Sequence, residues 1–215
     1  MAFTNVPLRR SAALGLAAAL LGYLPAFALA TLRRSAILAL ELPGELRDPA
    51  PMREVFEPGT ATVAGWLWYD AHLVPASLPT TDVFAGRAAL TNVNLLNALG
   101  GVALLLYLVP PALLVAAGYA FVRSGGITLA MAPSGGASVA VGYTPAMVLG
   151  AFLPTASATT PGGTAVVASP AGIPVIVAGL AYPLIFGALG GVLAKRRVEA
   201  TDGSEPRGGT PAERA

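Results

Sequence analysis

The sequence contains no cysteine and one histidine, His72, among its 215 residues. Without cysteine the chain can form no disulfide, no thiolate metal site and no thiol nucleophile. A single histidine also excludes a zinc site built from several histidines of one chain. No nucleophile motif is present. We therefore expect no metal, no cofactor and no enzymatic activity.

Charged residues are also scarce, at 11% of the chain against roughly 25% in soluble domains, whereas 55% of the residues are hydrophobic. The stretch from Ser124 to Ala194 contains no Asp, Glu, Lys or Arg at all. A charged side chain costs about 2.5–3.5 kcal/mol at the centre of a bilayer, so a long charge-free stretch is typical of membrane-embedded protein. The composition thus predicts an integral membrane protein with several spans.

Four apolar runs predict an all-α fold, a transmembrane bundle of four helices, because each span needs about 20 residues. Residues 11–32 and 173–194 fit this length directly. Residues 95–122 exceed it, and Pro110-Pro111 near the middle predicts a kink, since proline removes a backbone donor and clashes with the preceding turn. Residues 136–155 are diluted by Gly, Ser and Thr but carry no charge.

Basic residues near the span ends predict the orientation, because Lys and Arg flanks stay in the cytoplasm. Lys195-Arg196-Arg197 follows the fourth span, and four crossings place both termini inside. The segment 33–94, with seven acidic and five basic residues, is then an exported loop. We expect a single membrane domain over residues 1–197 of a cell-membrane protein and a disordered cytoplasmic tail over 198–215.

The N-terminus allows a second interpretation. Arg9-Arg10, an apolar run and Ala28-Leu29-Ala30 together imitate a secretory signal with its cleavage site. The run exceeds the usual signal length, and Arg33-Arg34 directly after the cut would hinder export, so we favour an uncleaved first span. If cleavage occurs, three spans remain.

Small residues at every fourth position predict close helix contacts, because membrane helices associate by tight packing rather than by hiding apolar surface. The third and fourth spans both carry this spacing. The candidate packing residues are Gly142, Gly150, Gly179, Gly187 and Gly191. In addition, the pentapeptide at residues 22–26 (GYLPA) returns at 142–146 (GYTPA), which indicates either two duplicated helical hairpins or coincidence.

Tyrosines close to prolines lie within the predicted spans, where a hydroxyl can satisfy a carbonyl that proline leaves free, or line a solute path. No predicted span contains a carboxylate, His or Arg at mid-depth. A pump driven by protons or sodium through a charged relay is therefore not expected.

The exported loop holds the most chemically varied stretch, residues 65–72 (GWLWYDAH), which contains both tryptophans and the histidine. We interpret it as an amphipathic segment at the outer lipid headgroups, anchored by the aromatic rings, with its polar side chains facing water. The alternative is a recognition platform or an acid–base pair, and the residue mix allows helix or strand. The residues concerned are Trp66, Trp68, Tyr69, Asp70 and His72.

The paired GY motifs of the first and third spans and the GWLWYDAH stretch resemble a group of uncharacterised small four-span membrane proteins of halophilic archaea. This resemblance implies a fold and no activity. From the broken helices and the apparent repeat we expect a protein that handles a small solute or lipid, as a transporter component. The alternative is a non-catalytic scaffold or sensor whose outer loop binds a partner. The lipid bilayer is the expected partner, nucleic acid is not, and a homo-oligomer or a membrane partner stays open.

Overall fold

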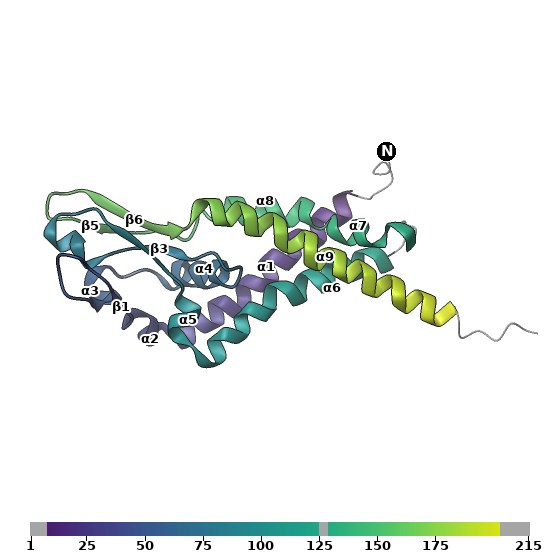
Figure 1. Ribbon diagram of the computed structural model, residues 1–215, viewed down its shortest axis with the longest axis horizontal. Coiled ribbons are helices and arrows are strands. Elements are labelled where there is room, and N and C mark those ends of the chain that lie inside the picture. The colour runs from purple at the N-terminus through teal and green to yellow at the C-terminus, as the bar shows by residue number, and fades with distance from the viewer. Residues whose placement is uncertain (1–7, 125–128, 203–215) are drawn as a thin grey trace, which may run out of the picture.

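Three long apolar helices dominate the computed structural model, which describes residues 8–124 and 129–202 (Figure 1). They are α1 (Leu8–Leu32), the segment Gly101–Arg123 and α9 (Gly172–Asp202). Each is long and apolar enough to cross a membrane, judged by length and composition. The described part of the chain is mostly helical, with 67% of its residues in helices.

The helix α1 turns its small residues inward and its large apolar residues outward. Gly15, Gly22 and Ala26 are buried, whereas Leu20 and Leu24 are 62% and 61% exposed. Water-soluble helices bury their leucines, so this arrangement fits a helix with lipid on its outer face and close helix contacts on its inner face.

The second predicted span begins later than expected. Residues 95–99 form a separate short helix, α5 (Leu95–Leu99), and a sharp break follows at Gly100 and Gly101, whose φ angles are +60° and +55°. Only glycine adopts such angles easily, and this local backbone requirement is invisible to a hydropathy pattern. The span then runs as η2 (Gly101–Leu108) and α6 (Val109–Arg123). The helix changes from 3₁₀ to α geometry next to Pro110-Pro111, where the sequence predicted a kink.

The third predicted span, 136–155, is two shorter helices. After the turn η3 (Leu129–Met131), α7 (Ala132–Ala137) and α8 (Ala140–Gly150) are separated at Ser138 and Val139. The Ser138 hydroxyl donates to the Gly135 carbonyl at 2.6 Å, and such local bonds compete with helical ones. The helix at the predicted fourth span is longer than predicted, because α9 continues to Asp202 and makes residues 198–202 helical. The rest of the predicted tail lies outside the described residues.

The predicted all-α fold is wrong at one end of the molecule, where a four-stranded antiparallel sheet has the order β4-β3-β6-β5. Ser77 of β3 pairs with Asn92 of β4 and with Ser169 of β6. The strands are β3 (Ala76–Pro79), β4 (Leu90–Val93), β5 (Ala156–Thr159) and β6 (Ala165–Pro170). Strands this short cannot be recognised in a hydropathy pattern that is averaged over the length of a membrane span.

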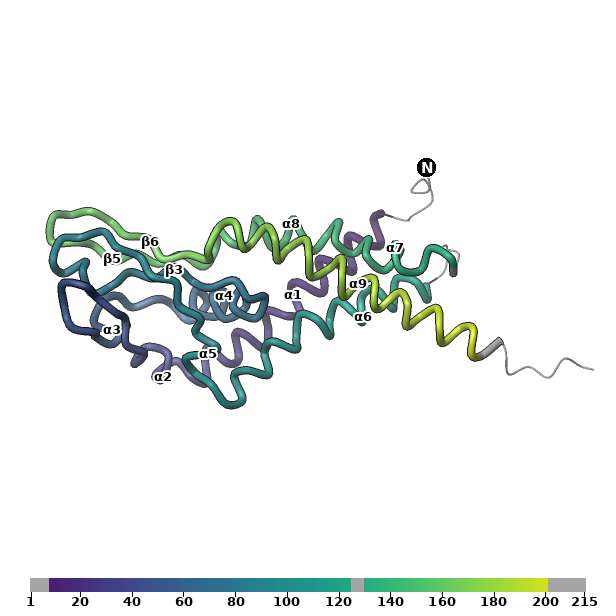
Figure 2. The backbone as a smooth tube through the Cα atoms, viewed as in Figure 1, coloured from purple at the N-terminus to yellow at the C-terminus, as the bar shows by residue number. Residues whose placement is uncertain are grey.

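Two separate connections build this end: the segment after α1 and the segment between α8 and α9 (Figure 1). The first also forms a small hairpin and short helices. These elements are α2 (Arg34–Leu38), β1 (Glu41–Leu42), β2 (Ala50–Pro51), α3 (Met52–Val55), α4 (Thr60–Asp70) and η1 (Thr81–Ala85). Figure 2 shows that the start of α1, α7 and the end of α9 lie at the opposite end of the molecule.

Glycines on α9 lie directly against the backbones of neighbouring helices. A Cβ at Gly187 would lie 2.6 Å from the carbonyl oxygen of Gly136 on α7. A Cβ at Gly191 would collide with the Ala132 carbonyl, and one at Gly190 with the Val115 carbonyl of α6. These approaches leave no room for any side chain, so the helices meet backbone to backbone.

The other candidate packing glycines have different neighbours. Gly142 of α8 lies against the backbone of Ala12 on α1. A Cβ at Gly179 would be 3.2 Å from the Met147 side chain, which is a looser contact. Gly150 faces Tyr69 of α4 instead of a long helix, since a Cβ there would be 3.0 Å from the tyrosine hydroxyl.

Candidate functional site: a buried polar network beside an apolar groove

The short helix α4 lies inside the bundle, in the space where the long helices diverge toward the sheet (Figure 1). Gly22 at the middle of α1 faces the Trp68 ring, and Gly65 of α4 faces the Pro154 ring after α8. Because both positions lack a side chain, α4 approaches its neighbours closely. The stretch that the sequence left open between helix and strand is thus the end of a helix packed against α1 and α8, with Ala71 and His72 in the turn that follows.

The predicted water-facing anchor is wrong, because protein surrounds this stretch. Trp66 and Asp70 have no exposed surface, His72 is 1% exposed, and Trp68 and Tyr69 are also buried. Amphipathicity within the stretch could not reveal this, since the covering residues come from helices far away in the sequence. The Trp66 indole donates to the Pro154 carbonyl at 2.7 Å, and the Tyr69 hydroxyl donates to the Met147 carbonyl at 2.6 Å.

His72 connects α4 to α8 and α9. Its Nδ1 lies 2.7 Å from the Trp68 carbonyl oxygen, which can only accept, so Nδ1 carries the hydrogen. Its Nε2 is hydrogen-bonded to the hydroxyl of Tyr143. In a neutral ring this nitrogen is the acceptor, so the tyrosine hydroxyl donates. The Tyr182 ring lies 5.0 Å from the histidine ring, measured between centroids. Every polar atom of the neutral imidazole therefore has a partner.

Asp70 points to another part of the fold. Its Oδ2 accepts the backbone N–H of Leu95 at 2.6 Å, at the first residue of α5. Its Oδ1 is buried and has no hydrogen-bond partner among the described residues. Asp70 and His72 bond to different elements, so the geometry supplies no acid–base pair. The Asp70 side chain instead fixes the turn that leads into the second long helix.

Tyrosines extend this polar network toward the same turn. The Tyr107 hydroxyl lies 3.0 Å from the side-chain oxygens of both Asn94 and Asn97. The sequence indicated the tyrosines beside prolines but not that Tyr143 and Tyr182 both contact His72, because this histidine lies in the connection after α1. The network places a carboxylic acid and an imidazole inside the helical bundle, where the predicted spans alone offer neither.

An apolar groove of about 430 Å³ lies next to the network, between α1, α4 and α8. Its mouth includes Leu20 and Leu153, which are 62% and 81% exposed. The polar groups at its wall are few. The groove is lined by Ala19, Leu20, Tyr23, Ala61, Thr62, Gly65, Trp68, Tyr69, Ala146, Met147, Gly150, Leu153 and Pro154. A wall of this composition can hold an apolar ligand and offers a charged one no counter-charge.

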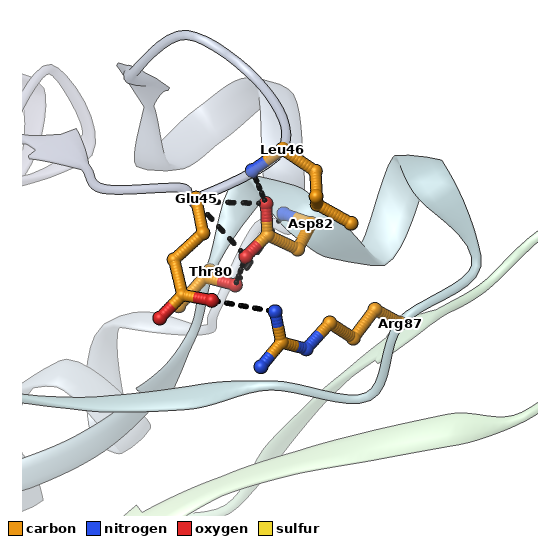
Figure 3. Close-up of polar contacts among 5 residues, drawn as sticks. All are labelled: Glu45, Leu46, Thr80, Asp82 and Arg87. Atoms are coloured by element: carbon orange, nitrogen blue, oxygen red, sulfur yellow. Dashed lines mark hydrogen bonds and ion pairs between the residues drawn. The ribbon is translucent and has the colours of Figure 1, made fainter.

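A second polar site ties together loops at the end of the molecule that carries the sheet (Figure 3). The Asp82 carboxylate accepts the backbone N–H groups of Glu45, at 3.0 and 3.1 Å, and of Leu46, at 2.8 Å. These N–H groups lower the pKa of Asp82 below its ordinary value of 3.8. Arg87 bonds to the Glu45 side chain across the same turn. The chain's own carboxylate fills this anion-binding turn, so we assign it a structural role.

Within residues 8–124 and 129–202 no three His, Asp or Glu side chains come together in a metal-binding group. No curated protein and no solved structure matches the chain. A family model, described as a family of unknown function (DUF7978), matches residues 2–198. The helical bundle, its outer sheet and the buried network of α4 all lie within the matched residues, and the chain belongs to this family.

Proposed function

We propose that this is a four-span membrane protein that binds the acyl chain of a lipid in the groove between α1, α4 and α8. The observation that carries the proposal is the apolar wall of the groove together with its exposed leucines at the mouth. A volume of about 430 Å³ is in the range of ligand pockets and suits part of one chain. Lipid handling is favoured over transport of a polar solute, because a polar solute would find almost no hydrogen-bond partner along this wall.

Sheet pairing supports the four-span topology. Strand β3 precedes the long helix η2–α6 and strand β6 follows α8, yet the two strands are hydrogen-bonded neighbours. If Gly101–Arg123 crosses the bilayer, the chain must cross back before β6, and α7–α8 is the segment that lies between them. Four spans also agree with the resemblance to proteins of halophilic archaea.

The distribution of basic residues supports an orientation with both termini in the cytoplasm. Lys195-Arg196-Arg197 and Arg123 lie at the end away from the sheet, as the positive-inside rule requires. The exception is Arg33-Arg34, on the sheet side. Arg34 pairs with Glu57 at 3.2 Å and donates to the Pro58 carbonyl at 3.1 Å, so it has a structural role outside. Trp68 packs on the middle of α1, which supports an uncleaved first span.

The experiment is photo-crosslinking in liposomes with a phospholipid that carries a diazirine near the end of one acyl chain. We expect crosslinks to concentrate in residues 19–23 and 146–154, the groove segments of α1 and α8. Ala146→Phe, which fills the groove from its half-buried wall, should remove most of this labelling. Ala116→Phe, at an exposed position of α6 outside the groove, is the matched control.

Two results would contradict the proposal. One is labelling spread evenly over the exposed faces of all long helices. The other is equal labelling of the groove segments in Ala146→Phe and wild-type protein, provided that the variant reaches the membrane in normal amounts.

A further inference from the structure

The end of the bundle away from the sheet concentrates basic side chains from three helices. They are Arg9 and Arg10 at the start of α1, Arg123 at the end of α6, and Lys195, Arg196 and Arg197 on α9. Arg9, Arg123, Arg196 and Arg197 are exposed. One carboxylate of the described residues, Glu199, is paired there, with Lys195 at 3.7 Å.

Hydrogen bonds hold two of these guanidinium groups beside the end of α6. Arg10 Nη1 donates to the Ser124 carbonyl at 3.3 Å, which ties α1 to α6. Arg123 Nη1 donates to the Tyr119 hydroxyl at 3.3 Å and its guanidinium carbon lies 5.9 Å from the ring centre. Arg197 of α9 lies close to the same tyrosine. Three helices therefore direct guanidinium groups toward one small region.

Arg10 and Arg123 keep unused hydrogen-bonding capacity. A guanidinium has five N–H donors in a planar fork that matches a phosphate. Within residues 8–124 and 129–202, neither Arg10 nor Arg123 has a carboxylate within ion-pair distance. Placing like charges together without a counter-charge costs free energy, and an added anion would remove that cost.

We propose that Arg10 and Arg123, with Arg197 beside them, bind the phosphate of an anionic lipid of the inner leaflet. The region directly adjoins apolar outer surface, since Leu8 of α1 and Leu193 of α9 are 57% and 43% exposed. A lipid whose phosphate is bound here can place its acyl chains along that surface, whereas a free anion makes no contact with the leucines that would add to its affinity. Basic groups between helices on the cytoplasmic side bind anionic headgroups in this way. The site is distinct from the apolar groove, which lies at the level of α4.

The test is thermal unfolding of the full chain in a neutral detergent, titrated with dioctanoyl phosphatidylglycerol. We expect a saturable rise in Tm with this lipid, and none with dioctanoyl phosphatidylcholine or with glycerol 3-phosphate at equal concentration. Arg123→Gln should weaken the apparent affinity about fivefold, the loss expected from one basic group near a membrane surface. Arg53→Gln removes an exposed arginine on the sheet side and should leave the affinity unchanged.

Arg10→Gln is the second variant and should weaken the affinity similarly, so that poor folding of one variant leaves the test intact. A rise in Tm of equal size with phosphatidylcholine would overturn the proposal. So would an equal rise with glycerol 3-phosphate, which would assign the site to a free anion, or an equal weakening by Arg53→Gln, which would indicate net charge alone.

Discussion

At the scale of single residues, the contact between His72 and Tyr143 has the most consequences for α4. Both side chains are fully buried, and the Tyr143 hydroxyl donates a hydrogen bond to Nε2 of a neutral histidine. Removing one partner of a buried hydrogen bond leaves the other without water or protein to replace it. His72 thus acts as a fixed link between the loop and the bundle, where the sequence alone favoured a solvated residue.

Tyr143→Phe should therefore lower the free energy of unfolding by about 1–3 kcal/mol, the cost of one unsatisfied buried acceptor. The measurement is unfolding in mixed detergent micelles. A double-mutant cycle provides the control: in a His72→Phe background the same substitution should cost much less, because its partner is already gone. Additive effects of the two substitutions would show that the contact contributes nothing.

Through Asp82, the stability of the turn at residues 44–48 depends on pH. The pKa of Asp82 is lowered in the folded protein, so its contribution to stability is complete above the ordinary value of 3.8 and is lost as the pH falls through the lower folded value. We expect proteolysis of the turn at residues 44–48 to accelerate only in this acidic window. In Asp82→Asn the turn should already be open to cleavage at neutral pH and should show a weaker acid response. An unchanged cleavage profile in Asp82→Asn would refute the role of the carboxylate.

At the scale of elements, the glycines of α9 set the distance between helices. Gly187 and Gly191 should tolerate no side chain, because the carbonyls of Gly136 and Ala132 occupy the space of a Cβ. We expect Gly187→Ala and Gly191→Ala each to destabilise the bundle by about 1–3 kcal/mol through forced backbone separation. Unfolding in mixed micelles measures this.

The same helix provides matched controls. A Cβ at Gly172 would meet nothing within 4 Å, so Gly172→Ala adds the same methyl group without a collision. Leu193→Ala, at an exposed position, should also be well tolerated. Equal losses in all four variants would mean that the glycine contacts do not hold the helices together.

How far the elements could be predicted depended on whether their determinants were local. The helices α1 and α9 followed from uninterrupted apolar runs. The kink predicted at Pro110-Pro111 was not confirmed: these residues lie at the start of α6, where the chain changes from 3₁₀ to α geometry. The break at Gly100 depends on a positive φ, and the strands are too short for a pattern of membrane-span length. These two features were missed.

The candidate site could be predicted less well than the helices. The residues of α4 were identified as chemically unusual, but their surroundings were not, because burial of Asp70 and His72 depends on contacts with residues 25 and 71 positions further along the chain. No periodicity within residues 65–72 encodes such partners. Gly22 and Gly65, which make room for the helix, were the local signal, but their spacing alone does not identify the ring that each one faces.

The apparent repeat itself has unequal surroundings in the two helices. Gly22 faces the Trp68 side chain, whereas Gly142 lies against the backbone of α1. Tyr23 donates to the Ala61 carbonyl at 2.8 Å, whereas Tyr143 bonds to His72. Both copies nevertheless place a tyrosine against the loop that carries α4. Each copy of the pentapeptide thus contributes a tyrosine that hydrogen-bonds to α4 or to the turn directly after it.

At the scale of the whole molecule, the sheet links two connections that are far apart in the sequence and, if the long helices span a bilayer, requires an even number of crossings between them. Under the proposed topology, the pairing of β3 with β6 keeps residues 76–79 and 165–170 on one side of the membrane. The cysteine-free sequence lets single cysteines report sides without background labelling. We expect Asp48→Cys and Thr159→Cys, both at exposed outer positions, to react with an impermeant thiol reagent in intact cells. Ser134→Cys on α7 and Ala200→Cys on α9 should react only after permeabilisation. Labelling of Thr159→Cys and Ser134→Cys from the same side would mean that α7–α8 does not cross, and the chain would then have three spans or a different sheet.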